Sequence, residues 1–518
     1  MVNRTTSVMA RDRRFFWCVT IIFVFLETVP YLIAWKSAGQ DYVFGGFLFN
    51  PQDGNSYLAK MYQGWLGEWR FKLPYTADAG QGAYLFIYYI FLGHLARLFH
   101  LQLIFIFHAA RIINTVILLC MIYRFLTAVL PANRQRRLAF VLMILGSGMG
   151  WLFLPFGKFT SDFWVAEAYP FLSAYANPHF PLSMALLLWL LSPSSKKKTA
   201  WDWALFIWVG LVLSLLSPFA VVIGVVILSA LAIWNWIEQR DIKYVKDEII
   251  CLIGLLVGGV PYLLYDVWVV GTDPVLRGWN AQNITPSPDI SDLVISLSPV
   301  LLLSILGIGI VLFKKFNPNR VLLVWAVLGI VLLYIPLGLQ RRFMIGLFIP
   351  IVGLAVLGME VFVNNRIFTR LIVVGVFLLS IPTNMIVLLS GYHGVQTYSP
   401  TFYITRGEEN AFQWIASQTP RDALVLAAPD TGLLIPAYTD RRVLYGHPFE
   451  TINAVQNETL VIEAYQSGNL SGSIVLKDVD YIFYGPREKI LTGRAGFGNL
   501  PVVYQNEGVI IYSNSLNQ

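Results

Sequence analysis

Apolar runs of membrane-spanning length recur along most of this chain, and they constrain its fold more than any other feature. A helix that rises 1.5 Å per residue needs about 20 apolar residues to cross a hydrocarbon core of about 30 Å. We predict eleven such spans, at about 15–36, 103–129, 138–156, 180–193, 203–217, 219–237, 249–270, 293–313, 321–337, 343–363 and 371–390. Only 13% of the 518 residues are charged, against roughly 25% in soluble domains. This composition excludes a cytosolic enzyme, a disordered chain and a nucleic-acid binder.

The charges are divided unequally between two parts of the chain. Residues 391–518 contain 8 basic and 12 acidic residues, a net of −4, whereas residues 1–390 contain 29 basic and 18 acidic residues, a net of +11. The basic excess gathers in five clusters between apolar runs, at 134–137, 196–198, 240–246, 314–320 and 366–370. Because cytoplasmic loops are rich in Lys and Arg, we expect these loops and the N-terminus inside, and residues 391–518 outside.

The first outer loop, 37–102, is predicted to contain two helices that lie in the membrane interface. The first covers 53–69 and places large side chains on one face, at Tyr57, Met61, Trp65 and Trp69. The second covers 83–99 and could itself be a span. Counting it as a span would move the basic cluster 134–137 outside and invert everything that follows, so we interpret it as interfacial.

Residues 391–518 have the pattern of a small extracytoplasmic α/β domain. Helices are expected at 407–418 and 450–467, and strands at 423–427, 442–446, 479–484, 502–504 and 509–512. Alternation of buried strands and helices is typical of α/β folds. We therefore predict two domains, a polytopic α-helical membrane domain at 1–390 and an α/β domain at 391–518.

Polar side chains beside a membrane are costly, so each is a candidate for function. Asp53 begins the first interfacial helix, where it is either an N-cap or a general base that faces a substrate. In the second outer loop, 157–179, Glu167 and His179 are either solvated loop residues or part of a polar pocket that holds a cation. His447 and Glu450, in the C-terminal part, are expected on the surface.

Arg341 and Arg342 break the positive-inside pattern, because the predicted topology places them outside. They either pair with lipid headgroups or bind the phosphate of a lipid-linked substrate, since guanidinium groups contact phosphate oxygens in a bidentate manner. No Gly-rich phosphate loop, zinc-type spacing or Ser-His-Asp arrangement is found in the sequence.

The segment Asp53-Gly-Asn-Ser-Tyr57-Leu-Ala-Lys60-Met-Tyr-Gln-Gly64 resembles the first-loop signature of the GT-C glycosyltransferases. These polytopic enzymes use polyprenyl-phosphate-linked sugars, and the similarity is nearest to the protein mannosyltransferase and Rgt-like branch. The resemblance implies that Asp53 is catalytic and that Glu167 is the second acid. The family's paired acids appear here as Gln52-Asp53 and as a single Glu167, which leaves dependence on a divalent cation open.

We therefore expect a bacterial inner-membrane glycosyltransferase that moves a sugar from a polyprenyl-phosphate donor to an acceptor hydroxyl at the outer face. The acceptor is a glycan, a lipid or a protein. Substrate contacts are expected from Tyr57, Lys60, His179, Arg341 and Arg342. The alternatives are a transporter or flippase for a lipid-linked component, and a membrane scaffold without catalytic activity.

Overall fold

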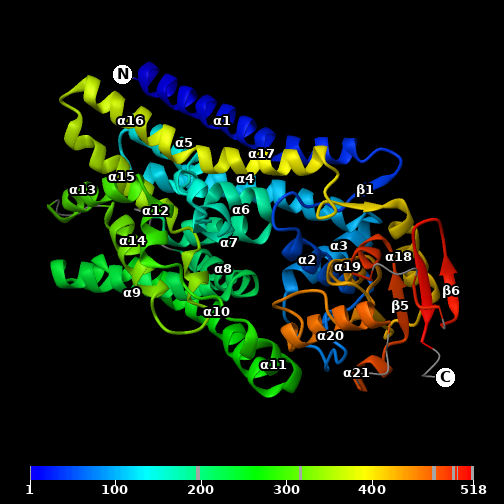
Figure 1. The fold of residues 1–518 in the computed structure, drawn as a ribbon. Helices are drawn as coiled ribbons and strands as arrows, with labels where there is room; N and C mark the ends of the chain where they lie inside the picture. The colour runs from blue at the N-terminus through cyan, green and yellow to red at the C-terminus, as the bar shows by residue number, and fades with distance from the viewer. Residues whose placement is uncertain are drawn as a thin grey trace. The chain divides into compact units, whose positions relative to one another are not determined.

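The computed structural model describes residues 2–193, 199–313, 318–468, 474–492, 496–498 and 500–514 (Figure 1). Two of the predicted basic clusters, 196–198 and the first part of 314–320, lie outside the described residues. The chain divides into two compact units. The first unit comprises Met1–Pro30, His108–Leu264 and Thr285–Tyr392, and the second comprises Tyr31–Phe107, Tyr265–Ile284 and His393–Gln518.

The first unit is helical, and the length of its helices makes the protein a multi-pass membrane protein. Six described helical segments are long and apolar enough to cross a membrane, at Asp12–Ser37, Leu103–Val129, Pro218–Gln239, Lys246–Thr272, Gln340–Phe362 and Arg366–Gln396. The pair α12 (Ile290–Leu297) and α13 (Val300–Phe313) is bent by 83° and counts as a seventh if it forms one span. The eleven-span topology stays a prediction.

Several predicted spans correspond to shorter helices. These are α5 (Asn133–Leu145), α7 (His179–Leu191), α8 (Ala200–Leu216) and α14 (Arg320–Leu333). Helix α5 ends at Gly146, and short 3-10 helices follow it through the second half of the span predicted at 138–156. At 1.5 Å per residue, a 13-residue helix is about 20 Å long, which is less than a hydrocarbon core of about 30 Å.

Helix α15 (Phe348–Gly358) lies in the core of the first unit, and all eleven of its residues are buried. A helix that is apolar on every side requires neighbours on every side. Its contact with α13 depends on small residues, because a Cβ added at Gly307 or Gly358 would overlap backbone carbonyl oxygens at Leu354 and Leu303. The backbones of the two helices therefore approach closely where glycine permits it.

In the second unit, the first loop forms two packed helices, α2 (Pro51–Trp65) and α3 (Ile87–Phe99). A Cβ at Gly64 or Gly93 would overlap the backbone of the other helix, so these two glycines allow the close contact. Helix α2 ends at Trp65, and the prediction that Trp69 shares its face is wrong; the Trp69 ring stacks instead on His94 of α3, with centroids 4.1 Å apart.

The C-terminal part of the second unit contains a five-stranded sheet with strand order β4-β3-β5-β7-β6. Strand β3 pairs in parallel with β4 and β5, whereas β7 pairs antiparallel to β5 and β6. The strands are β3 (Leu424–Leu426), β4 (Arg442–Val443), β5 (Tyr481–Tyr484), β6 (Val502–Gln505) and β7 (Ile510–Ser513). The helices are α18 (Arg406–Gln418), α19 (Pro429–Thr439), α20 (Ala454–Ser467), α21 (Ile474–Lys477) and α22 (Pro486–Thr492). Each predicted strand segment thus overlaps an observed strand.

The first loop and the C-terminal part share one core. Strand β1 (Tyr42–Phe44) pairs antiparallel with β2 (Tyr403–Thr405), and the Val443 amide of β4 donates to the Pro74 carbonyl at 3.0 Å. Tyr75 is fully buried among side chains of the sheet, and its hydroxyl donates to the Leu433 carbonyl at 3.2 Å. The domain boundary at 390 stays a prediction, while the compact unit that holds the sheet also holds the first loop.

Candidate active site

Asp53 occupies the third position of α2, and Asn50 is the N-cap residue. The Asn50 side chain accepts the Asp53 backbone N–H at 3.4 Å and donates from Nδ2 to Asp53 Oδ2 at 2.6 Å. The interpretation of Asp53 as an N-cap is therefore wrong, because Asn50 satisfies the free backbone group. The Asp53 side chain remains 44% exposed and sits at the positive end of the helix, where a carboxylate is stabilised.

His447 lies against Asp53, although it comes from the C-terminal part of the chain. Its Nε2 is 3.6 Å from Asp53 Oδ1, and its side chain is only 2% exposed. Its Nδ1 accepts the backbone N–H groups of Phe449 and Glu450, both at 3.2 Å. The expectation that His447 lies on the surface is wrong, because the turn after β4 folds the ring inward against Tyr75.

Lys60, about two turns further along α2 than Asp53, forms a buried ion pair with Glu450. Lys60 Nζ is 2.7 Å from Glu450 Oε1, its side chain is 1% exposed, and the Ser56 hydroxyl contacts both groups. Burial raises the pKa of the Glu450 carboxyl, but the Lys60 ammonium, together with hydrogen bonds from Lys60 and Ser56, opposes the effect of burial, and the pKa lies below its usual value. Glu450 is therefore buried rather than on the surface as expected, and the substrate-binding role of Lys60 stays a prediction.

Tyr57 of α2 stacks on Tyr89 of α3, with ring centroids 4.2 Å apart and planes 6° from parallel. Tyr57 is half-buried, and the Lys60 ammonium lies 5.6 Å from its ring centroid. Stacking fixes the direction of the phenol ring beside Asp53 on the same helix. Its expected contact with a substrate stays a prediction.

In the first unit, Glu167 and Arg341 lie close together although they are far apart in sequence. Glu167 belongs to η4 (Ala166–Ala168) and Arg341 to η6 (Gln340–Met344), and Arg341 Nε is 3.8 Å from Glu167 Oε1. The Arg341 guanidinium also lies over the Trp164 ring, 4.8 Å from its centroid. The Glu167 carbonyl accepts the Gly346 N–H at 2.9 Å, which joins segment 157–179 to the segment after η6.

Arg342 and His179 complete the predicted set. Arg342 is half-buried in the same short helix as Arg341. His179 is the first residue of α7, where it is buried and its ring lies 4.0 Å from that of Phe180. All four of the predicted residues Glu167, His179, Arg341 and Arg342 belong to the first unit, whereas Asp53, Tyr57 and Lys60 belong to the second.

Two acids that connect segment 157–179 with α12, the buried Asp162 and the partly buried Asp292, were missed by sequence reasoning. Asp162 accepts Thr160 Oγ1 at 2.6 Å and the Gly150 N–H at 3.0 Å, and Asp292 accepts the Ser161 hydroxyl at 2.8 Å. Burial raises the pKa of Asp162, and these hydrogen bonds oppose the rise. The available signal was the polar triplet at 160–162 between two phenylalanines, which has the composition of an ordinary loop.

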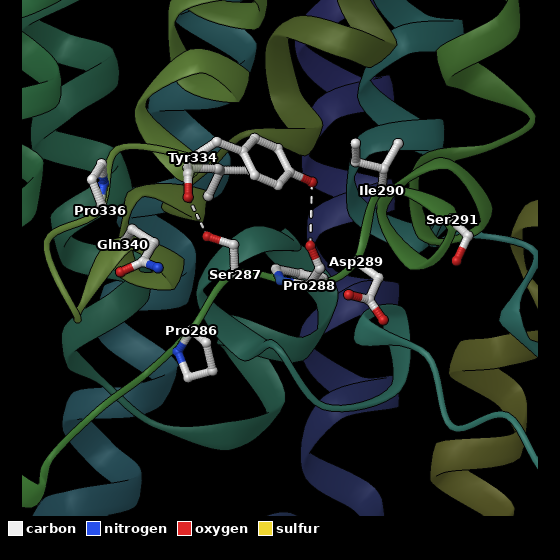
Figure 2. A pocket seen from close by; sticks show the side chains of 10 residues that line it. Pro286, Ser287, Pro288, Asp289, Ile290, Ser291, Tyr334, Pro336 and Gln340 are labelled. Atoms are coloured by element: carbon white, nitrogen blue, oxygen red, sulfur yellow. Dashed lines mark hydrogen bonds between the residues drawn. The ribbon is translucent and has the colours of Figure 1, made fainter.

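A pocket of about 550 Å³ lies beside η6 in the first unit (Figure 2). The Tyr334 hydroxyl donates to the Pro288 carbonyl at 3.2 Å, and the Ser287 hydroxyl donates to the Leu333 carbonyl, so both walls are held together. The pocket is lined by residues 286–291 with Leu333, Tyr334, Pro336 and Gln340. Since Gln340 directly precedes Arg341, the pocket borders the segment predicted to bind phosphate.

Among the described residues, no three His, Cys, Asp or Glu side chains are gathered as metal ligands.

No family model and no curated protein matches the chain. Among solved structures, the Archaeoglobus fulgidus oligosaccharyltransferase tethered to an acceptor peptide with the NVT sequon aligns with a TM-score of 0.54 at 13% identity, covering 96% of this chain and 74% of that chain. Archaeoglobus fulgidus AglB with an inhibitory peptide and a dolichol-phosphate aligns with a TM-score of 0.54 at 12% identity, covering 91% of this chain and 69% of that one. The chain thus shares the fold of these two oligosaccharyltransferase structures.

Proposed function

We propose that the protein is a glycosyltransferase that moves a sugar from a polyprenyl-phosphate-linked donor to an acceptor hydroxyl. The observation that carries this proposal is the Asp53 carboxylate, which accepts a hydrogen bond from Asn50 and lies 3.6 Å from His447 Nε2, while 44% of the side chain stays exposed. A carboxylate that is both fixed and accessible can receive a proton. The shared fold supports a lipid-linked donor, since one of the similar oligosaccharyltransferases binds a dolichol-phosphate.

In the proposed reaction, the acceptor oxygen attacks the anomeric carbon of the donor sugar. Asp53 takes the proton of the acceptor hydroxyl as the new carbon–oxygen bond forms. The bond between the anomeric carbon and the phosphate oxygen breaks, and its electron pair leaves with the polyprenyl phosphate. Fixed orientation of the base lowers the entropic cost of the transition state.

For the donor, we propose that Arg341 and Arg342 bind the phosphate group. Guanidinium groups stabilise the negative charge that grows on a departing phosphate. Glu167 and the Trp164 ring hold the Arg341 guanidinium from two directions, which supports a role for Glu167 in orienting it. The pocket beside η6 offers carbonyl and carboxylate oxygens to a hydroxyl-rich ligand, and we place the donor sugar there.

The cellular setting follows from the basic loops. We propose a bacterial cytoplasmic membrane, eleven crossings, a cytoplasmic N-terminus and an extracytoplasmic α/β part at 391–518. A hexose or pentose is the transferred group, and the acceptor is a glycan, lipid or protein. Sugar transfer at the outer face needs no nucleotide site, in agreement with the sequence, which contains no Gly-rich phosphate loop.

The test begins with mass spectrometry of glycans and glycolipids from cells with and without the protein, which identifies the product. Purified protein in vesicles is then given the corresponding undecaprenyl-phosphate sugar. Asp53→Asn should lower transfer by about 10²–10⁴-fold, while Asp41→Asn, an exposed acid before the same helix, should not. Unchanged transfer by Asp53→Asn contradicts the catalytic assignment. Movement of a solute or lipid across the vesicle without glycosylation favours a transporter instead.

A further inference from the structure

The Asp53–His447 contact joins residues 394 positions apart, and the histidine ring is held more firmly than a surface side chain. His447 and Gly446 both donate their backbone N–H groups to Thr451 Oγ1, at 3.2 and 3.3 Å. A Cβ at Gly446 would lie 2.7 Å from the Tyr75 ring, so this turn is packed against the first loop. The imidazole is thus positioned before any substrate binds.

The hydrogen bonds of the ring determine which nitrogen faces Asp53. Because Nδ1 accepts two backbone N–H groups, the proton of the neutral ring must reside on Nε2. Nε2 is the atom that lies 3.6 Å from Asp53 Oδ1. This separation is slightly longer than a hydrogen bond, and catalytic contacts often shorten when a substrate binds.

Three charged groups lie around the ring. The Lys60 ammonium pairs with the Glu450 carboxylate, with Nζ and Oε1 2.7 Å apart. The remaining carboxylate is that of Asp53, whose Oδ1 lies 3.6 Å from Nε2 and whose side chain is 44% exposed. A donor on Nε2 that moves within hydrogen-bond distance of Oδ1 fixes the direction of this carboxylate and leaves the rest of the group open to an acceptor.

We propose that His447 is a positioning residue for Asp53, so that the C-terminal part of the chain completes the acceptor-activating group of the first loop. This inference rests on the proposed function of Asp53. It gives the C-terminal part a direct task in the transfer step. The pair follows the general pattern in which a neighbouring group fixes the direction of a catalytic base; here the base is the carboxylate and the neighbour is the imidazole.

Replacing His447 by Asn or by Gln separates the positioning role from a structural role, because each amide keeps one of the two polar positions of the ring. His447→Asn keeps an oxygen near the place of Nδ1 that can accept the backbone N–H groups of the turn, but it removes the group that faces Asp53. His447→Gln places its amide nitrogen near the position of Nε2 and loses the Nδ1 acceptor. His393→Asn, an exposed histidine in α17 (Pro382–Gln396), is the matched control.

Sugar transfer by the purified full-length variants is measured with varied acceptor, together with their thermal unfolding. We expect His447→Asn to unfold near the wild-type temperature and to lose about 10²-fold in kcat with little change in KM for acceptor. We expect His447→Gln to retain much more of the wild-type kcat than His447→Asn does. The double variant Asp53→Asn with His447→Asn should have the same kcat as Asp53→Asn alone, because both substitutions act on one carboxylate.

The outcomes distinguish the two proposals. If wild-type protein transfers sugar and Asp53→Asn abolishes it, but His447→Asn transfers at the wild-type rate, only the positioning role is overturned. The positioning role is also overturned if His447→Gln loses activity and His447→Asn does not. Activity would then depend on the acceptor that holds the turn and not on the group that faces Asp53. If Asp53→Asn transfers normally, the proposed function fails whatever His447 does.

Discussion

Replacing Lys60 by Met should strongly destabilise the second unit. Met keeps most of the apolar stem between the Phe71 and Phe86 rings, which lie 5.3 and 4.4 Å from the ammonium. What is lost is the charge, and Glu450 is then left buried without its partner. Removing one member of a buried ion pair costs about 3–5 kcal/mol, because the remaining charge still lacks water. At about 2–4 °C per kcal/mol, the unfolding temperature should fall by roughly 10 °C.

The assay is thermal unfolding of the protein in detergent, followed by tryptophan fluorescence. The double variant Lys60→Met with Glu450→Gln should recover more than half of the loss, since the buried negative charge is then gone. Lys158→Met, a change at an exposed lysine outside this network, is the control. The reasoning is refuted if Lys60→Met unfolds at the wild-type temperature. A Lys60→Met variant that keeps the wild-type unfolding temperature but has a higher KM for the donor would support the predicted substrate contact of Lys60.

Four further predictions concern stability, donor binding and topology. Burial raises the pKa of Asp440 to about 7, above an unfolded value of about 3.9, so native stability should fall as pH rises through this window. This loss of unfolding free energy is worth roughly 4 kcal/mol, and Asp440→Asn should remove it. Measuring unfolding at pH 4 and pH 8 checks this, and an unchanged pH dependence in the variant would assign the titration to another group. Arg341→Lys keeps the charge but loses bidentate geometry, so KM for the donor should rise about tenfold while KM for the acceptor stays constant. Gly93→Ala should cost about 1–3 kcal/mol by separating α2 from α3, whereas Gly375→Ala, which has open space, should cost little in the same unfolding assay. In a background without native cysteines, the cysteine of Gln135→Cys should not react with an impermeant thiol reagent added outside. Labelling of this cysteine would contradict the predicted topology.

Hydropathy predicted most of the helices, because a run of apolar residues needs no knowledge of its neighbours. The positions of the five strands in the C-terminal sheet could also be predicted, since each lies in a short run with β-branched or aromatic residues, whereas β1 and β2 were not predicted. The early end of α5 at Gly146 could not be predicted, because the apolar run continues beyond it. Its end reflects tertiary contacts, in which the following residue, Ser147, donates its backbone N–H to the Ser380 carbonyl at 2.7 Å.

The candidate site was predictable residue by residue but not as a set of contacts. Asp53, Glu167 and Arg341 were chosen because charged groups beside a membrane are costly, and Glu167 and Arg341 do lie together. The partners His447 and Glu450 were misjudged as surface residues. Both contact residues about 390 positions away, and no local pattern in sequence encodes such a pairing.

The two-stranded pairing of β1 with β2 has a consequence for the synthesis of the protein. About 360 residues separate Phe44 from its partner Tyr403. At 5–20 residues per second, a ribosome needs roughly 20–70 s to make that stretch. During this interval the first loop has left the ribosome, but β2 and Glu450 have not yet been made. Lys60 therefore has no counter-ion, and the edge of β1 has no partner strand. Newly made chains should therefore pass through a stage at which a protease cuts the first loop, and chains that stop before β2 should stay at that stage and be removed by quality control.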